Sequence, residues 1–329
     1  MSRFATVGVA GAGAWGTALA NTIARTGRRV VLWARDTMQA EAMAREGENR
    51  GKLPGVRLHG AVAPTALPAT LTKAEALLIA VPAQAVREVC MALAPVARKA
   101  CPVIVCAKGI ERGTESFMAD IVADSMPLVR PAILSGPSFA ADVAAGLPTA
   151  VVIAAPDGLA GELAAALSSS VLRLYHTTDM RGAEIGGAAK NVLAIAAGMV
   201  EGRGLGDSAR AALTARGFAE LRRFAAAHGA KPETLMGLSG LGDLMLSTST
   251  PKSRNFAFGL ALGRGEPLAS AAHGQLAEGA FTAGVLAGMA RAGGIAMPVC
   301  EAVAAILESR LSIGDAISAL MSRPVRAEE

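Results

Sequence analysis

The stretch VGVAGAGAWGTALANTIART, residues 7–26, places an apolar β-rich run, a glycine-rich turn and an alanine-rich helical segment in succession. Its glycines match the GxGxxG pattern, which indicates dinucleotide binding when it follows a strand and opens a helix. Gly11 allows a tight turn, Gly13 lets the backbone approach a pyrophosphate, and Gly16 permits close packing of helix on strand. The stretch therefore predicts the first strand–turn–helix unit of a Rossmann-type domain.

A secretory signal peptide is the alternative interpretation, because the run is apolar, follows Arg3 and ends in small residues. The positions of the glycines favour the strand–turn–helix interpretation. No apolar run in the chain reaches the ~18 uninterrupted residues of a membrane span, so we expect no membrane insertion.

The composition is that of a globular protein with room for two domains, since 52% of its 329 residues are hydrophobic and 18% are charged. The net charge is +5, but the basic residues are dispersed. This distribution argues against a nucleic-acid partner and weakly favours small anionic ligands. The four cysteines stand singly and the four histidines are scattered. We therefore predict no metal site and no disulfide framework, and we expect a cytoplasmic protein with reduced thiols.

In the first half of the chain, β-rich runs alternate with helical stretches. The predicted strands span residues 4–11, 28–34, 75–82, 101–109, 130–137, 148–155 and 171–177, with helices such as 15–27 and 115–126 between them. After about residue 180 only helices are predicted, at 182–202, 207–228, 255–263, 281–292, 298–308 and 314–321. We predict an α/β Rossmann-type domain with a mainly parallel sheet over residues 1–180, followed by an all-α domain over 181–329.

The choice of cofactor depends on Arg35 and Asp36, which follow the predicted strand 28–34. An acid about 20 residues past the glycine pattern holds the ribose 2′-hydroxyl of NAD, whereas an arginine accommodates the 2′-phosphate of NADP. Both residue types are present, so NAD and NADP stay open. NADP is slightly preferred because Arg35 comes first after the strand. A solvated pair is an equally good interpretation of Asp36.

Candidate ligand contacts follow two other predicted strands, because open α/β sheets bind ligands at the carboxyl ends of their strands. They are Lys108 in AKG, and Gly136, Ser138 and Ala140 in SGPSFA. Lys108 could instead be a surface lysine, and Ser138 a helix N-cap.

In the helical half, Asp243 lies in the glycine-rich turn of GLSGLGDL. The segment SRN, residues 253–255, precedes an apolar helix and offers a hydroxyl, a guanidinium and an amide in the first turn. Such a helix start is a plausible phosphate cradle. A capping serine beside a solvated arginine is the alternative, and Glu278 in AEGAF has the same ambiguity.

Lys190 is the only charged residue between Glu184 and Glu201, within EIGGAAKNVLAIAAGMV. A buried lysine costs free energy unless it is paired. Its neighbours on one helical face include Gly186 and Gly187, which leave room for a ligand or another backbone. Desolvation lowers a lysine's pKa and allows proton exchange with a reacting oxygen. The alternative is a snorkelling lysine at a domain boundary.

Together these motifs resemble those of the NAD(P)-dependent glycerol-3-phosphate dehydrogenases. GAGAWGTALA, LWAR, AVP, AKG, SGPSFA, AAKN, GLGDL, SRN and AEG occur in the order and spacing of that family, from the first strand to Glu278. The resemblance implies a cytoplasmic homodimer that uses NADH or NADPH to reduce dihydroxyacetone phosphate to sn-glycerol 3-phosphate for phospholipid synthesis.

The resemblance also implies residue roles, with Lys190 matching the proton-transferring lysine. The implied substrate contacts are Lys108, Gly136, Ser138, Lys190, Asp243, Ser253, Arg254 and Asn255. The implied cofactor contacts, besides the three glycines of the first turn, are Ala14, Trp15, Arg35, Lys108, Ala140, Arg254, Leu276 and Glu278.

Two positions depart from the family pattern. Ala14 stands where a serine is common, which removes a hydroxyl but leaves the backbone N–H. Phe256 stands where a second arginine is usual, which could weaken an auxiliary contact near the phosphate or cofactor without removing Arg254.

Two rival functions remain. One is a ketopantoate-reductase-like NADPH-dependent oxidoreductase, whose substrate carries a carboxylate and no phosphate. The other is a non-catalytic dinucleotide sensor, which fits poorly with the presence of Lys190, Asp243 and SRN together.

Overall fold

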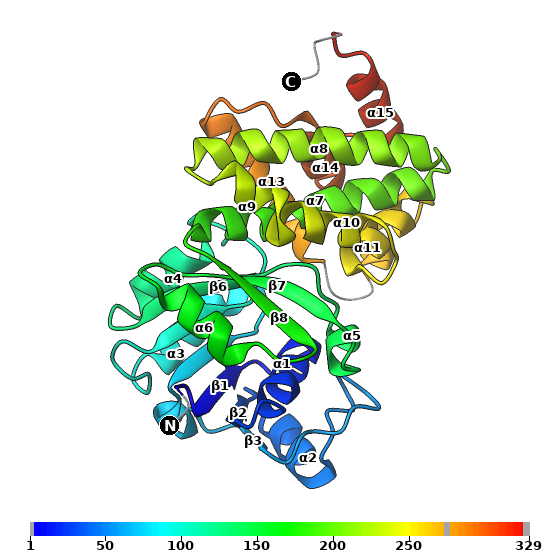
Figure 1. Ribbon diagram of the computed structural model, residues 1–329. Coiled ribbons are helices and arrows are strands. Elements are labelled where there is room, and N and C mark those ends of the chain that lie inside the picture. The colour runs from blue at the N-terminus through cyan, green and yellow to red at the C-terminus, as the bar shows by residue number, and fades with distance from the viewer. Residues whose placement is uncertain (1–2, 273–276, 325–329) are drawn as a thin grey trace.

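The computed structural model describes residues 3–272 and 277–324, and the first part of the chain forms one eight-stranded sheet (Figure 1). The strand order is β3-β2-β1-β4-β5-β6-β7-β8, and every neighbouring pair is parallel except the antiparallel pair β6–β7. The predicted α/β class with a mainly parallel sheet is confirmed. The strands are β1 (Thr6–Ala10), β2 (Arg29–Trp33), β3 (Val62–Thr65), β4 (Ala76–Ile79), β5 (Pro102–Val105), β6 (Arg130–Ser135), β7 (Thr149–Ala154) and β8 (Leu172–Thr177).

The edge strand β3 was not predicted from the sequence. It is four residues long and contains Pro64, which cannot donate to a ladder and is tolerated at sheet edges. The inner strands β4 and β5 are buried at every position, as their aliphatic sequences require.

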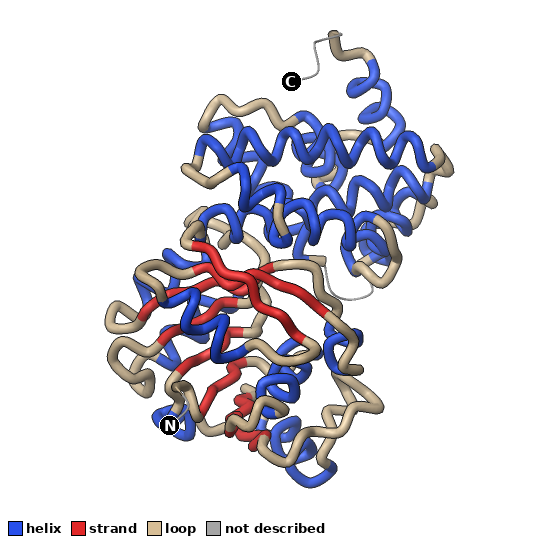
Figure 2. Tube along the Cα trace, viewed as in Figure 1, coloured by secondary structure: helices blue, strands red, loops and turns tan. Residues whose placement is uncertain are grey.

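Helices cover the sheet, as Figure 2 shows. They are α1 (Ala14–Ala24), α2 (Thr37–Glu46), α3 (Val86–Leu93), α4 (Met118–Ser125), α5 (Ala140–Ala144) and α6 (Leu159–Leu167), with 3₁₀ turns η1 (Pro68–Lys73) and η2 (Ala83–Ala85).

Among its described residues, the second part of the chain contains helices joined by loops and turns, and no strand. Its elements are α7 (Met180–Gly202), α8 (Asp207–Ala227), α9 (Pro232–Met236), the π-helical turn η3 (Leu238–Gly242), α10 (Asp243–Thr248), α11 (Arg254–Gly263), α12 (Leu268–Ala271), α13 (Glu278–Ala292), α14 (Pro298–Leu307) and α15 (Ile313–Met321). The six predicted helices are confirmed. The short elements α9, η3, α10 and α12 were not predicted, because glycine-rich or short segments give no clear periodicity.

The long helix α7 forms the centre of this helical part. It is buried throughout Gly182–Val200. Among the described helices it alone is long and apolar enough to cross a membrane, and its most apolar window is wholly buried, as in the core helix of a soluble protein. Close backbone contact between α7 and α11 requires glycine on both helices: a Cβ on Gly198 of α7 would lie 2.2 Å from the carbonyl oxygen of Phe256, and one on Gly259 of α11 would lie 2.0 Å from that of Ile195.

Two buried carboxylates cap helices from a distance. Glu184 on α7 accepts the backbone N–H of Ala119 at 2.7 Å, at the start of α4. Glu220 on α8 accepts that of Val299 at 2.9 Å, at the start of α14. Burial raises the pKa of each carboxyl to about 7, although the backbone donors oppose the shift. Both groups therefore link folding stability to pH.

We predict that Glu220→Gln stabilises the chain at alkaline pH. Because the folded-state pKa is raised above the ordinary 4.5, the stability linked to the protonated carboxyl is fully present below pH 4.5 and is lost as the pH rises through about 7. Glutamine keeps the acceptor for Val299 but cannot ionise. Denaturant unfolding should show Glu220→Gln gaining about 2 kcal/mol on wild type between pH ~5 and pH ~8. The exposed Glu233→Gln should show no such trend, and equal pH profiles for Glu220→Gln and wild type would contradict the account.

Candidate active site

The glycine-rich turn between β1 and α1 has open space at one glycine only. Gly11 has φ +112°, and a Cβ there would lie 2.6 Å from the carbonyl oxygen of Ala80. A Cβ on Gly16 would lie 1.9 Å from the carbonyl oxygen of Gly11, whereas one on Gly13 would meet nothing within 4 Å. Gly13 is the N-cap of α1, where unpaired backbone N–H groups can receive an anion. The turn therefore has its open space at the N-terminus of α1, where the sequence predicts the pyrophosphate.

The other predicted cofactor residues near this turn are Ala14 and Trp15 in the first turn of α1, and Arg35 just past β2. Asp36 is the N-cap of α2 and accepts the backbone N–H groups of residues 38 and 39 at 2.9 and 3.3 Å. The side chain of Arg35 is 76% exposed and lies 3.5 Å from Glu88. The carboxylate of Asp36 is thus engaged with its own helix, while the arginine remains at the surface.

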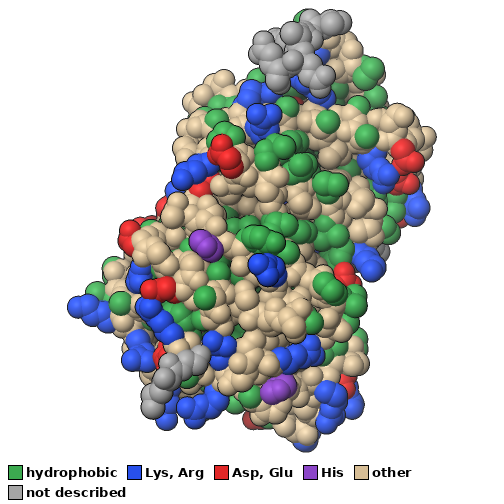
Figure 3. All heavy atoms as spheres, in the orientation of Figure 1, with side chains coloured by type: hydrophobic (Ala, Val, Ile, Leu, Met, Phe, Trp, Pro, Cys, Tyr) green, Lys and Arg blue, Asp and Glu red, His purple; other side chains and the backbone are tan. Residues whose placement is uncertain are grey.

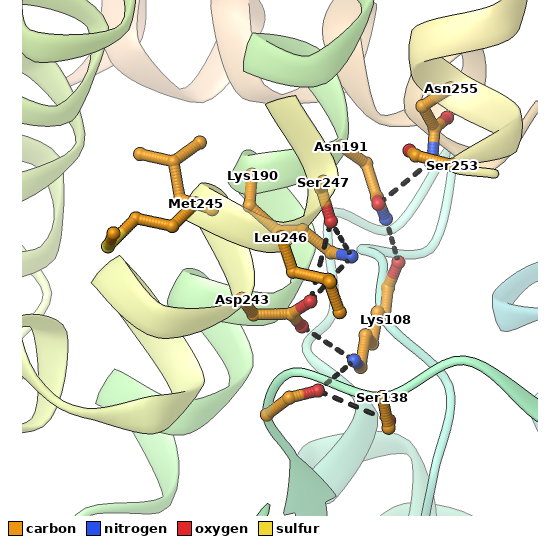
Figure 4. A network of polar contacts seen from close by, with 12 residues as sticks. Lys108, Ser138, Lys190, Asn191, Asp243, Met245, Leu246, Ser247, Ser253 and Asn255 are labelled. Carbon is orange, nitrogen blue, oxygen red and sulfur yellow. Dashed lines mark hydrogen bonds and ion pairs between the residues drawn. The ribbon is translucent and has the colours of Figure 1, made fainter. Parts of the chain in front are cut away.

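Three charged side chains from distant parts of the sequence meet between the sheet and the helices (Figure 4). Lys108 Nζ donates to Asp243 Oδ2 at 2.6 Å and to the carbonyl oxygen of Gly136 at 2.8 Å. Lys190 Nζ lies 2.9 Å from Asp243 Oδ1 and donates to Ser247 Oγ at 2.7 Å. We call Lys108, Lys190 and Asp243 the charged triad. Four predicted site residues are therefore in direct contact.

The fold explains how the triad assembles. Lys108 and Gly136 follow β5 and β6, and the carboxyl ends of neighbouring parallel strands reach the same sheet edge. Lys190 comes from the middle of α7, and Asp243 is the first residue of α10. The site therefore exists only when the helical part is packed on that edge of the sheet.

Burial and charge act in opposite directions on these groups. Burial lowers the pKa of Lys190 below its usual 10.5, with help from Lys108, and Asp243 opposes the shift. Burial alone would raise the pKa of the Asp243 carboxyl, but the two lysines outweigh it and hold that pKa below 3.8. The triad therefore keeps Asp243 ionised and makes Lys190 a stronger acid than an ordinary lysine.

The glycines beside Lys190, Gly186 and Gly187, leave space that other parts of the chain fill. A Cβ on Gly186 would lie 2.5 Å from the carbonyl oxygen of Ser239, in η3. A Cβ on Gly187 would lie 2.7 Å from Ser135 Oγ and 3.3 Å from Lys108 Cγ. These two glycines let η3 and Lys108 approach α7, which brings the charged triad within contact distance.

A chain of amides ties the triad to α11 and α13. Asn191 Nδ2 donates to the carbonyl oxygen of Lys108 at 3.1 Å, and Asn255 Nδ2 donates to Asn191 Oδ1 at 2.9 Å. Asn255 Oδ1 accepts the backbone N–H of Gly279 at 2.9 Å. The side-chain oxygen of Asn255 and one of its amide hydrogens are therefore bonded within the protein. Its second amide hydrogen is left for the predicted contact to phosphate.

The remaining predicted residues lie around this network. Ser138 Oγ donates to the carbonyl oxygen of Gly136 at 3.3 Å, and Ala140 begins α5. Ser253 is the N-cap of α11 and accepts the backbone N–H of residue 256 at 3.4 Å, and the exposed Arg254 begins that helix. The capping role weighed for Ser253 is thus present, and its hydroxyl still has capacity for a ligand.

Glu278, at the start of α13, links the helical part to the sheet. Its Oε1 accepts the backbone N–H of Ala83 at 3.2 Å, and burial raises the pKa of the carboxyl. Leu276, expected to contact the cofactor, lies outside the described residues.

Ser247 and Asn191 were not among the predicted site residues. Ser247 lies four residues after Asp243, so both side chains project from one face of α10. That spacing could have identified Ser247, but only if a helix had been predicted there. Asn191 adjoins Lys190 in the motif AAKN, and its contact depends on α11, which no local pattern places beside α7.

Two family models match the chain. The model described as NAD-dependent glycerol-3-phosphate dehydrogenase N-terminus matches residues 6–160, and that of the corresponding C-terminus matches residues 179–318. A glycerol-3-phosphate dehydrogenase [NAD(P)+] of Azorhizobium caulinodans is 60% identical over 329 residues, with both chains fully covered.

Solved structures show the same similarity at the level of the fold. The crystal structure of glycerol-3-phosphate dehydrogenase from Coxiella burnetii has a TM-score of 0.91 and 38% identity, covering 97% of this chain and 99% of that one. A ketopantoate reductase from Ralstonia eutropha has a TM-score of 0.61 at 19% identity, covering 93% and 98%, which shows a shared fold alone.

We predict that Asp243→Asn destabilises the fold, because it leaves two lysine ammonium groups facing each other without the buried carboxylate between them. Removing one partner of a buried ion pair costs about 3 kcal/mol of unfolding free energy. Chemical denaturation at neutral pH measures this. The control is Asp207→Asn, whose carboxylate lies 2.6 Å from Arg210 but is 87% exposed, and it should change little. A loss for Asp243→Asn no larger than that of the control would contradict the account.

Proposed function

This chain belongs to the NAD-dependent glycerol-3-phosphate dehydrogenase family, and from that premise we propose that Lys190 is the proton donor and acceptor of its reaction. The reaction is hydride transfer between NAD(P)H and dihydroxyacetone phosphate, giving sn-glycerol 3-phosphate. The bound cofactor supplies the hydride.

The contacts of Lys190 carry the proposal. An ammonium group has three N–H bonds. One is directed to Asp243 Oδ1 at 2.9 Å and one to Ser247 Oγ at 2.7 Å, which leaves the third for a reacting oxygen. Burial lowers the pKa of Lys190, so proton donation to a developing alkoxide is easier than from a solvated lysine. In the oxidative direction the neutral amine takes the proton back.

We propose that the remaining triad members orient the substrate. Lys108 is fixed by Asp243 and by the carbonyl of Gly136, and its third N–H can contact a substrate oxygen. Arg254 and the capped N-terminus of α11 hold the phosphate, with the spare amide hydrogen of Asn255. Gly136, Ser138 and Ser253 complete the substrate contacts.

The cofactor is NAD or NADP, and the proposal favours NADP slightly. The carboxylate of Asp36 caps α2, so it is engaged away from a ribose 2′-position, and Arg35 offers an exposed guanidinium after β2. We propose Gly11, Gly13, Ala14, Trp15 and Gly16 as contacts along the α1 turn. Lys108, Ala140, Arg254, Leu276 and Glu278 are proposed as the contacts farther along the chain.

The setting of the enzyme is also proposed. We assign the dinucleotide-binding unit to residues 1–180 and the substrate-binding and catalytic unit to 181–329, in a cytoplasmic homodimer without a nucleic-acid partner. Oxidation of NADH and NADPH, assayed with dihydroxyacetone phosphate and separately with ketopantoate, tests the substrate. Turnover of ketopantoate alone would identify the reductase alternative, and turnover of neither would identify the sensor.

We predict that Lys190→Ala lowers kcat by about 10²- to 10⁴-fold, the usual contribution of general acid–base catalysis. The dissociation constant for the cofactor should change little, because Lys190 contacts α10 rather than the glycine turn. Steady-state kinetics and cofactor titration measure the two quantities. The matched control Lys231→Ala removes an exposed lysine of the helical part and should leave kcat unchanged. A kcat for Lys190→Ala within a few-fold of wild type would refute the role.

We predict that Arg35→Ala reduces kcat/KM for NADPH by about tenfold relative to NADH, the loss of one charge-assisted contact to the 2′-phosphate. Arg45→Ala removes another exposed arginine of the same region, and should leave the ratio as in wild type. An unchanged NADPH-to-NADH ratio in Arg35→Ala would exclude this contact.

A further inference from the structure

A cavity of about 310 Å³ lies at the end of the sheet opposite the charged triad. It forms where the amino ends of four neighbouring strands meet: Phe4 precedes β1, Glu75 precedes β4, Pro102 begins β5 and Arg130 begins β6. We call it the basic cavity. Ligands of open α/β sheets ordinarily bind at the other edge, so the reaction described above does not use it.

The lining of the basic cavity has an excess of positive charge. Four of its side chains are cationic and one, Glu75, is anionic. Arg3 is paired with Glu162 at 2.7 Å, and Glu75 accepts the backbone N–H of Ala5 at 3.1 Å. The other three cations, Arg98, Lys99 and Arg130, have no carboxylate within 4.0 Å among residues 3–272 and 277–324. In Figure 3 basic side chains gather beside the N-terminal end of the chain.

The backbone holds these three cations at one place. Arg130 is the register partner of Pro102, so it stands at the same level of the sheet as the segment 98–101. The N–H of Arg130 donates to the carbonyl oxygen of Cys101 at 2.9 Å, and the N–H of Ala100 donates to that of Leu128 at 2.7 Å. Ala100 has φ +59°, which turns the segment back toward β6. Two backbone hydrogen bonds therefore hold the segments that carry these cations side by side.

Compensation of helix dipoles does not explain this cluster. The effect of a cation at a helix C-terminus falls off beyond the last turn. The helix α3 ends at Leu93, and α4 ends at Ser125, so Arg98, Lys99 and Arg130 all follow a helix end by about a further turn or more.

We propose that the basic cavity binds a phosphomonoester dianion. The two guanidinium groups and one ammonium, less the one negative charge of Glu75, leave two positive charges, which match a phosphate dianion. Arginine forks bind the oxygens of such a group in pairs. The volume is at the lower end of ligand pockets, which fits one small metabolite or one lipid headgroup. Phe4 and Leu159 also line the cavity but are buried, so a ligand would meet chiefly the polar groups of the cavity.

The experiment is hydrogen exchange of the full chain at low ionic strength, with inorganic phosphate as the probe. Phosphate should slow the exchange of backbone amides in residues 96–104, far from the charged triad. The double variant Arg98→Gln/Arg130→Gln should raise the phosphate concentration needed for half of this protection at least tenfold, while kcat stays at the wild-type value. The single variant Lys99→Gln should raise that phosphate concentration by a smaller factor.

The matched control is Arg216→Gln/Arg291→Gln, which removes the same charge from exposed positions of the helical part and should keep full protection.

Vesicles of phosphatidylcholine with and without phosphatidate distinguish the source of the phosphate. Binding to phosphatidate vesicles that free phosphate displaces identifies a headgroup, and protection by free phosphate without vesicle binding identifies a soluble ester. No protection in wild type by either probe, or equal protection in the double variant, overturns the proposal.

Discussion

The carboxylate of Asp243 is buried between two lysines, and much of the site depends on it. Each oxygen has its own cation, Lys108 at 2.6 Å and Lys190 at 2.9 Å. A buried carboxylate costs several kcal/mol unless it is paired, and so does each buried ammonium. The three groups are therefore stable only together. Because Lys108 follows a strand of the sheet and the other two lie on helices, this charge balance also fixes how the two parts of the chain meet.

The scarcity of aromatic residues has a structural counterpart around α7. Aromatic residues make up 3% of the chain, and glycine and alanine take their place at the helix crossings. At Gly186 and Gly198 a side chain would overlap a neighbouring backbone carbonyl. Close approach of backbones leaves little free volume, so the packing that would otherwise come from large side chains comes from main-chain contact. It also holds Lys190 at a fixed depth, where desolvation acts on its pKa.

Much of the fold was predictable because its signals are local. The GxGxxG turn, the aliphatic runs of β4 and β5, and the periodic helices α8 and α14 each depend on neighbouring residues. The strand β3 was not predictable, since it is short and contains Pro64. The triad residues were named from motifs, but the pairing of each Asp243 oxygen with its own lysine was not predicted. Identifying Ser247 from the sequence required a helix to be predicted after an unusual π-helical turn. The capping role of Asp36 depends on α2 beginning at the very next residue, Thr37. Gly186 could have faced a ligand or a backbone, and only the packing of η3 decides between them.

The central claim is that Lys190 delivers the proton to the carbonyl oxygen of the substrate. A crystal structure with dihydroxyacetone phosphate and a cofactor analogue that cannot transfer hydride tests this most directly. The account predicts that Lys190 Nζ lies within about 3.2 Å of the C2 oxygen while it keeps its contacts to Asp243 and Ser247. A C2 oxygen bound by another donor, with Lys190 Nζ more than about 4 Å away, would contradict it.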